Sequence, residues 1–216
     1  MTTFDITNMN RKQLVAYTVV GGLAALLLII LFYHSLDLPV AKSAHTLKDS
    51  FAVTAGKLIS DIASKHVIQT ISFFTLILGM IDYLLNGLQN RTRTMLLIAF
   101  STITAMLIGD ELKWFFGRCR PPLFFESETY GFTWFSGKYL QNSFPSGHTL
   151  RIFSLATAIS IILPCKKYLP FIVALLVGCS RVIVNKHYPS DVIFGCYIGM
   201  TCALWSYYFL YRKNNE

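Results

Sequence analysis

Residues 15–33 read VAYTVVGGLAALLLIILFY and contain no charged side chain. A helix of about 20 apolar residues crosses the hydrocarbon core of a bilayer, with all of its backbone hydrogen bonds made internally. Five later stretches of the chain are also apolar, with few charges. We therefore predict six transmembrane helices, over Val15–Tyr33, Val67–Leu85, Thr94–Phe116, Ser146–Pro164, Leu169–Val184 and Val192–Tyr211.

The first apolar stretch is expected to be retained as a helix. Arg11 and Lys12 precede it, as basic residues precede a signal peptide's apolar region, but the stretch is too long for such a region and lacks a small-residue cleavage site. No repeat or low-complexity segment divides the chain. The predicted fold is all-α: a polytopic membrane protein with six transmembrane helices in one bundle, forming a single domain over residues 1–216. Its functional half is expected over about residues 94–211.

The composition supports a membrane protein and argues against other classes. Of the 216 residues, 54% are hydrophobic and 14% charged, which leaves too little polar surface for a soluble domain of this size. The net charge is +8, but the basic residues fall between apolar stretches instead of along one face. They indicate membrane topology, anionic lipids and a phosphate site, and not nucleic acid. The five cysteines form no CxxC pair, so neither zinc nor a disulfide framework is indicated.

Basic pairs in the short connections predict the orientation. Cytoplasmic connections carry an excess of Lys and Arg, so we expect both termini in the cytoplasm and the segments 34–66 and 117–145 on the outer side. The opposite side carries a comparable positive charge, mixed with most of the acidic residues. The residues that define the cytoplasmic side are Arg11/Lys12, Arg91/Arg93, Lys166/Lys167 and Arg212/Lys213, with Asp5 and Glu216 as its only acids.

Three motifs lie at the outer ends of the later helices. They read Lys113-x6-Arg120-Pro121, Pro145-Ser146-Gly147-His148 and Ser180-Arg181-x5-His187-x3-Asp191. Each residue type has an ordinary explanation when it occurs alone: histidines at helix ends are usually structural or merely solvated, and basic residues at a membrane interface usually snorkel. The ordered conjunction is different, because charges at membrane depth are costly and are usually kept for function.

The cations of these motifs suit a phosphoryl group. Lys113, Arg120 and Arg181 can neutralise its oxygens, and the planar guanidinium matches their geometry. Ser146 is expected to be the N-cap of its helix, which leaves backbone N–H groups at the positive end of the helix dipole to bind an anion. Gly147 would let the backbone approach that anion closely.

The two histidines and the aspartate suit acid–base and nucleophilic chemistry. His148 and His187 can supply a nucleophile and a proton donor for phosphate hydrolysis. Asp191 lies four residues after His187 and can fix the tautomer of its ring. No aspartate cluster suggests a magnesium site.

These three motifs resemble the tripartite signature of the type 2 phosphatidic acid phosphatase superfamily, which also includes bacterial acid phosphatases and vanadium haloperoxidases. The chain matches every specified position of KxxxxxxRP, PSGH and SRxxxxxHxxxD. The resemblance implies a metal-independent membrane phosphatase without cofactors. It assigns His187 as the nucleophile that forms a phosphohistidine, Asp191 as its orienting group and His148 as the acid. The residues implied to bind the phosphoryl oxygens are Lys113, Arg120, Ser146, Gly147 and Arg181.

The implied substrate is a lipid phosphate, and the partners are that substrate and membrane lipids, with no nucleic acid and no obligate protein partner. Candidate substrates are lipid A, undecaprenyl diphosphate, phosphatidylglycerophosphate and phosphatidic acid. The expected location is a bacterial inner (cytoplasmic) membrane, with the active site facing the periplasm or exterior. Substrate choice is expected in residues 123–144, although a packed lid is an equal alternative.

Other functions stay open or are disfavoured. Lipid-to-lipid phosphate transfer uses the same residues and stays open. A non-catalytic lipid-phosphate binder or transporter needs cations but not His148, His187 and Asp191 together. A haloperoxidase is disfavoured by the membrane spans, and a DNA-binding membrane anchor lacks a soluble domain.

Arg151 lies outside the signature but on the same helix face as His148, three residues further on. An arginine in an apolar helix should face the protein interior and find a partner. One hypothesis is a structural ion pair with Asp82, Asp110 or Glu111. The other is a second anionic group of the substrate.

Overall fold

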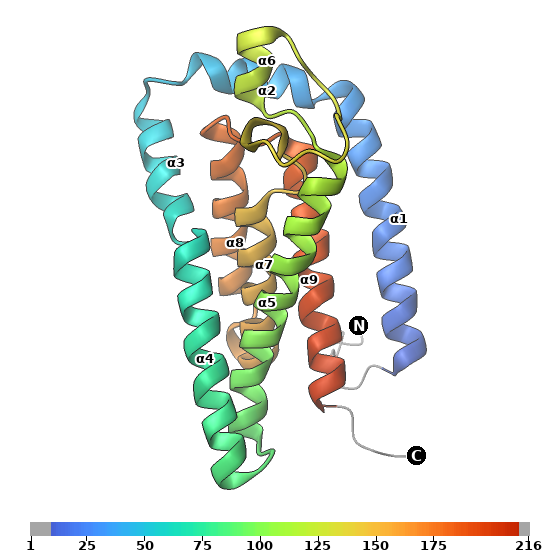
Figure 1. Cartoon of the computed structure of the whole chain (residues 1–216), viewed down its shortest axis with the longest axis vertical. Coiled ribbons are helices and arrows are strands. Elements are labelled where there is room, and N and C mark those ends of the chain that lie inside the picture. The colour runs from blue at the N-terminus through green and yellow to red at the C-terminus, as the bar shows by residue number, and fades with distance from the viewer. Residues whose placement is uncertain (1–9, 212–216) are drawn as a thin grey trace.

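The computed structural model describes residues 10–211, and within them every regular element is helical, apart from an isolated bridge between Arg118 and Phe132 (Figure 1). The all-α prediction is confirmed for these residues. The elements in chain order are α1 (Arg11–Ser35), α2 (Asp37–Thr46), α3 (Phe51–Asp61), α4 (Lys65–Asn86), α5 (Asn90–Phe116), α6 (Pro121–Ser127), η2 (Tyr139–Gln141), α7 (Gly147–Ile162), η3 (Pro164–Lys166), α8 (Tyr168–Ile183) and α9 (Pro189–Tyr211).

Four helical segments are long and apolar enough to cross a membrane: α1, α5, α9 and the stretch Phe51–Asn86. Two further apolar helices, α7 and α8, have only 16 residues each, which corresponds to a length of about 24 Å. The multi-pass membrane architecture therefore agrees with the sequence, whereas the count of six crossings stays a prediction. The short helix α7 lies in the middle of the bundle, where it packs against α5, α8 and α9.

Residues 34–66 are not a simple external connection. They form α2 and α3, and α3 leads into α4 through a short break at residues 62–64, so that the two stack end to end in Figure 1. Ser64 caps α4 by accepting a hydrogen bond from the N–H of Val67 at 3.4 Å. Gly56 of α3 lies so close to the α8 end that a Cβ there would be 2.9 Å from Cγ2 of Val184. The segment thus forms one wall of the bundle.

Glycines bring α9 against the backbone of α7. A Cβ at Gly195 would lie 2.9 Å from the carbonyl oxygen of Ser146, and a Cβ at Gly199 would overlap the carbonyl of Leu150. Small residues four apart allow such close backbone approach between membrane helices. This contact fixes the start of α7 beside the start of α9.

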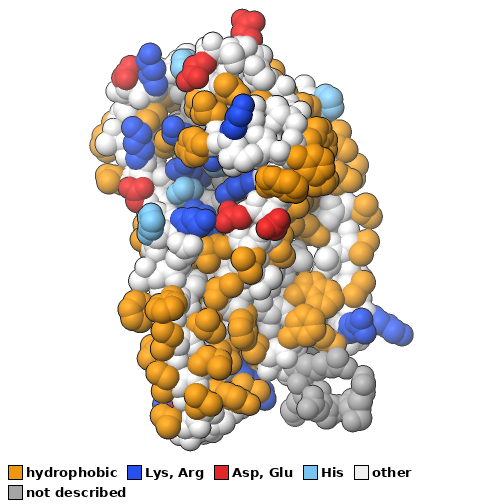
Figure 2. Space-filling view, in the orientation of Figure 1, with side chains coloured by type: hydrophobic (Ala, Val, Ile, Leu, Met, Phe, Trp, Pro, Cys, Tyr) orange, Lys and Arg blue, Asp and Glu red, His pale blue; other side chains and the backbone are white. Residues whose placement is uncertain are grey.

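Most of the charged side chains visible in Figure 2 lie toward one end of the molecule, with fewer Lys and Arg near the other end, while apolar side chains cover much of the face between them. Large exposed hydrophobic residues are numerous on α1, α4 and α8, and such a surface is unfavourable in water but suits lipid. The start of α1, the α4–α5 turn and the end of α9 lie at the opposite end (Figure 1). Of the residues used to predict orientation, Asp5, Arg212, Lys213 and Glu216 lie outside the described residues.

Candidate active site

Gly117 ends α5 and turns the chain toward the site. It has a left-handed conformation with φ 55°, and its N–H donates to the carbonyl of Lys113 at 3.0 Å. A Cβ at this position would lie 2.9 Å from the backbone nitrogen of Trp134, so both the conformation and the crowding favour glycine. Lys113 is therefore in the last turn of α5, and Arg120 lies three residues beyond the turn.

Ser146 is the N-cap of α7, as predicted, although its side chain caps no backbone N–H. Its hydroxyl accepts a hydrogen bond from the hydroxyl of Thr149 at 2.9 Å, and its own N–H donates to the carbonyl of Asp191 at 3.0 Å. The first turn of α7 therefore keeps its N–H groups free for an anion.

Gly147 lies beneath two cations. A Cβ there would be 2.6 Å from Nζ of Lys113 and 3.2 Å from Nη1 of Arg151. The absence of a side chain lets both positive groups reach the start of α7, where the helix dipole already favours an anion.

His187, in the connection between α8 and α9, is 3% exposed and held in one orientation. Its Nδ1 lies 2.8 Å from the backbone carbonyl oxygen of Ser143. Because a carbonyl only accepts, Nδ1 carries the proton and Nε2 keeps the lone pair that a nucleophile needs. Burial lowers the pKa of His187 to about 3, against the opposing influence of Asp191. The ring is thus neutral at ordinary pH.

Asp191 is completely buried and accepts hydrogen bonds from several donors. It accepts hydrogen bonds from Nη1 of Arg118 at 2.5 Å, from the hydroxyl of Ser143 at 2.6 Å and from the N–H of Tyr188 at 2.8 Å. Its Oδ2 lies 3.5 Å from Nδ1 of His187, further than the Ser143 carbonyl. In this geometry Asp191 acts on His187 chiefly by fixing Ser143 and the turn at Tyr188.

Three arginines of the site have no carboxylate within 4 Å among residues 10–211. Arg120 donates to the carbonyls of Tyr139 (3.0 Å) and Asn142 (3.2 Å) and stacks over the Tyr139 ring. Arg181, 9% exposed, donates to the hydroxyl of Ser60 at 2.8 Å. Positive charge that is buried without an internal counter-ion indicates an anionic ligand.

Arg151 is the third of these arginines, and the predicted ion pair with Asp82, Asp110 or Glu111 is wrong. Its Nε donates to the carbonyl of Ala63 at 3.1 Å, and it is 5% exposed. Asp82 pairs with Arg91 near the α4–α5 turn, at the end of the bundle opposite the site. Asp110 contacts Lys65 at 3.0 Å and Lys113 at 3.8 Å instead. The sequence could not show that none of these acids, one on α4 and two on α5, pairs with Arg151.

His148 connects these groups. It is half-buried and interacts electrostatically with Arg181, Arg151, His187 and Lys113. His187 interacts in the same way with Arg120, Arg181 and Asp191. Together with Ser146 and Gly147 in the same turn of α7, every residue predicted from the three motifs lies at this end of the bundle.

The sequence did not reveal the buried network behind the site. Arg118 is completely buried and donates to Asp37 at 2.6 Å, to Asp191 and to Ser190 at 2.6 Å. Burial alone would lower the pKa of Arg118, but Asp191 and Asp37 together raise it above its ordinary value. In the sequence, the one indication of this buried network was Asp37, an acidic residue shortly after the first apolar stretch.

No group of three or more His, Cys, Asp and Glu side chains within residues 10–211 is arranged to hold a metal ion. Metal independence stays a prediction that chelation can test.

The fold and the site agree with a known family. The PAP2 superfamily model matches residues 94–215, more than half of the chain. The chain therefore belongs to the PAP2 superfamily.

The names of two relatives refer to different lipid substrates. The chain is 35% identical over 105 residues to a lipid A 1-phosphatase of Rhizobium johnstonii, covering 49% of this chain and 43% of that protein. It is 34% identical over 113 residues to an undecaprenyl-diphosphatase of Sulfolobus acidocaldarius, covering 50% and 52%. The chain thus spans about half the length of these curated relatives.

A solved structure supports the fold over most of the chain. The PAP2-type phosphatidylglycerolphosphate phosphatase from Bacillus subtilis superposes with a TM-score of 0.62 at 20% identity, covering 89% of this chain and 96% of that one.

Proposed function

We propose that this protein is a membrane lipid phosphatase that removes phosphate from a lipid headgroup through a phosphohistidine on His187. The observation that carries the proposal is the pairing of a neutral, oriented His187 with buried arginines that lack carboxylate partners. Nucleophilic attack needs the free Nε2, and the phosphoryl oxygens need the positive charge. Pure binding would need only the cations.

The first chemical step transfers the phosphoryl group to the protein. Nε2 of His187 attacks phosphorus and the bond from phosphorus to the lipid oxygen breaks. His148, protonated once the bound phosphate offsets the surrounding cations, gives its proton to that oxygen. Lys113, Arg120, Arg151, Arg181 and the free N–H groups at the start of α7 stabilise the charge on the phosphoryl oxygens.

The second step restores the histidine. Water attacks the phosphorus, the bond to Nε2 breaks, and His148 accepts a proton from the water. Inorganic phosphate then leaves. If a lipid hydroxyl replaced water, the same residues would catalyse lipid-to-lipid transfer.

The proposal includes the arrangement of the protein in its membrane. We infer six crossings, with α7 and α8 as the two short ones, in a bacterial inner membrane. The site end would then face the periplasm or exterior, opposite the basic pairs at the α4–α5 and α7–α8 turns.

Phosphate release by purified protein from a panel of lipid phosphates tests the proposal. We expect release by the wild type in excess EDTA, inhibition by vanadate, and no turnover by His187→Ala. His148→Ala should lose about 10²–10⁴-fold in rate. Arg11→Gln, far from the site, is the matched control. Activity that disappears on chelation and returns with added metal would overturn the metal-independent mechanism, and near wild-type rates in His187→Ala would overturn the nucleophile.

Labelled substrate separates the alternatives. Label recovered as inorganic phosphate indicates hydrolysis, whereas label on a second lipid indicates transfer. Tight substrate binding with no release of either kind would indicate a non-catalytic binder.

A further inference from the structure

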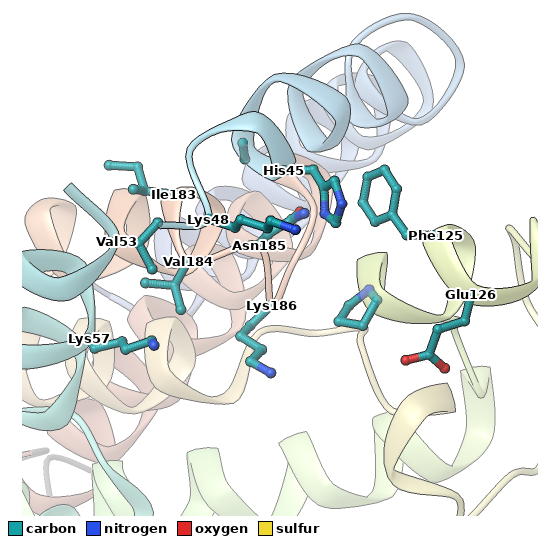
Figure 3. Close-up of a pocket in the computed structure, with 12 residues that line it drawn as sticks. His45, Lys48, Val53, Lys57, Phe125, Glu126, Ile183, Val184, Asn185 and Lys186 are labelled. Carbon is teal, nitrogen blue, oxygen red and sulfur yellow. The ribbon is translucent and has the colours of Figure 1, made fainter. Parts of the chain in front are cut away.

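A cavity of about 480 Å³ lies between α2, α3, α6 and the end of α8, beside the candidate active site (Figure 3). Its lining carries Lys48, Lys57 and Lys186, together with His45, against one carboxylate, that of Glu126. Figure 3 shows the lysine side chains extending into the cavity from different elements, with Glu126 on the α6 side. The cavity is therefore predominantly positive.

The three lysines are available to a ligand. None of them forms an ion pair within residues 10–211. Lys48 and Lys57 are exposed, and Lys186 is half-buried. Three unpaired ammonium groups around a cavity of this size suit a polyanionic headgroup such as a phosphate monoester, which each can contact as a point charge.

Three walls of the cavity continue directly into the active site. Lys186 is the residue before His187, and its carbonyl accepts a hydrogen bond from Arg120 at 3.5 Å. Pro122 lies two residues after Arg120, in the first turn of α6. The carbonyl of Lys57 accepts from Ser60, whose hydroxyl in turn accepts from Arg181. The cavity thus adjoins the candidate active site through Lys186, α6 and Ser60.

The fourth wall closes the cavity away from the site. The ring of His45 on α2 stacks on the ring of Phe125 on α6, with centroids 3.9 Å apart. This contact joins two elements far apart in the sequence and gives the cavity a defined boundary.

We propose that this cavity binds a second anionic group, a phosphate carried by the same lipid whose other phosphate is cleaved at His187. The inference rests on the proposed function and narrows its substrate class to lipids with two phosphates on one headgroup. Lys48, Lys57 and Lys186 are specificity-determining residues in this account, because they touch the part of the substrate that does not react.

A pair of synthetic lipids tests the proposal. Both carry the same acyl chains and sugar headgroup, one with a single phosphate monoester and the other with two. The variant is Lys48→Gln/Lys57→Gln, whose positions are exposed and so tolerate substitution. Lys42→Gln, an exposed lysine of α2 that does not line the cavity, is the matched control.

We expect the double variant to lower kcat/KM for the bis-phosphorylated lipid about tenfold, the order expected for losing two surface contacts to a phosphate. Its activity on the mono-phosphorylated lipid should stay within about twofold of wild type, and Lys42→Gln should match wild type on both. Equal losses on the two lipids would indicate a general attraction to anionic membrane and overturn the proposal. Unchanged activity on both would overturn it as well.

Binding to His187→Ala protein, which leaves the lipid intact, gives an answer that does not depend on turnover. Fluorescent versions of the two lipids in neutral detergent micelles should differ about tenfold in affinity, and the double lysine substitution should remove the difference. Excess inorganic phosphate should compete weakly, because it lacks the second attachment. Absence of phosphate release in the first assay with this binding difference present would refute the phosphatase function alone, whereas equal binding of the two lipids refutes the second-phosphate site.

Discussion

The backbone carbonyl of Ser143 positions the nucleophile, His187. The side chain of Ser143 binds Asp191. The carbonyl accepts from Nδ1 of His187, while the hydroxyl donates to Asp191. A histidine held by a carbonyl and backed by a carboxylate has a fixed tautomer and a free Nε2. At the residue scale, therefore, the contact that sets the tautomer of His187 is made by a backbone carbonyl, a group that every residue carries.

The neutral state of His187 makes stability depend on pH. Its pKa is lowered by burial to about 3, from an ordinary 6.5. Between these values the unfolded chain binds a proton that the folded chain does not, so the free energy of unfolding falls as the pH falls from 6.5. We expect wild type to lose up to about 1.4 kcal/mol more per pH unit in this range than His187→Gln.

Thermal unfolding in detergent between pH 7 and 4.5 measures this difference. His34→Gln, an exposed histidine at the end of α1 that lines neither the site nor the lysine cavity, is the control and should follow wild type. Parallel pH profiles for wild type and His187→Gln would contradict a buried neutral ring.

Arg118 balances two buried carboxylates, and its loss should be costly. Removing one partner of a buried ionic network leaves unpaired charge and typically costs about 3–5 kcal/mol. We expect Arg118→Met to lower the unfolding temperature strongly and to impair activity through Asp191. Arg118→Lys should recover only part, since one ammonium cannot reproduce the guanidinium's contacts with Asp37, Ser190 and Asp191.

Thermal unfolding and phosphate release in the same preparations test this, with Arg11→Gln as an exposed arginine control. A fully stable Arg118→Met protein would mean that Asp37 and Asp191 are satisfied without the arginine.

At the scale of elements, the site depends on how closely α7 and α9 approach. The start of α7 supplies Ser146, Gly147 and His148, and the start of α9 supplies Asp191. Gly195 and Gly199 set the spacing between these helices. A change in the middle of α9 should therefore reach the site without touching it.

We expect Gly199→Val to destabilise the protein by about 1–3 kcal/mol or more, because the new side chain must displace the backbone of α7. Residual folded protein should show reduced activity, since Asp191 and Ser146 move apart. Gly137→Ala is the control, because nothing lies within 4 Å of a Cβ there. Unfolding temperatures of the two variants check the prediction, and a Gly199→Val protein as stable as Gly137→Ala would contradict the close packing.

At the scale of the whole molecule, the two ends have different characters. One end holds the site, α2 and α6, and the other holds the turns at residues 87–89 and 164–166. A chain of this kind must place one end on each side of the bilayer, and the basic pairs choose which.

A reporter that is active only outside the cytoplasm should work when fused near residue 130, and fail near residues 88 or 166. The expected pattern corresponds to a site that faces the exterior. The opposite pattern would mean that the enzyme handles lipids of the inner leaflet. A paired reporter that is active only in the cytoplasm provides the control, because it should give the complementary result at each position.

The helical, apolar character of the chain and the candidate site residues of the three motifs could be predicted from the sequence alone. Hydrophobic length is a local property, and so it can be read without knowing which helices touch. The motifs also predicted the convergence of Lys113, His148, Arg181 and His187, because each lies at a helix end on the same side.

Only the tertiary structure decided what depends on distant contacts. The partner of Arg151, the hub at Arg118 and the carbonyl that orients His187 each join segments far apart in the chain. The lysine cavity is of the same kind, because its walls come from α2, α3, α6 and the α8–α9 connection. Periodicity and charge show which side chains are available at an end of the bundle, whereas packing alone decides which of them meet.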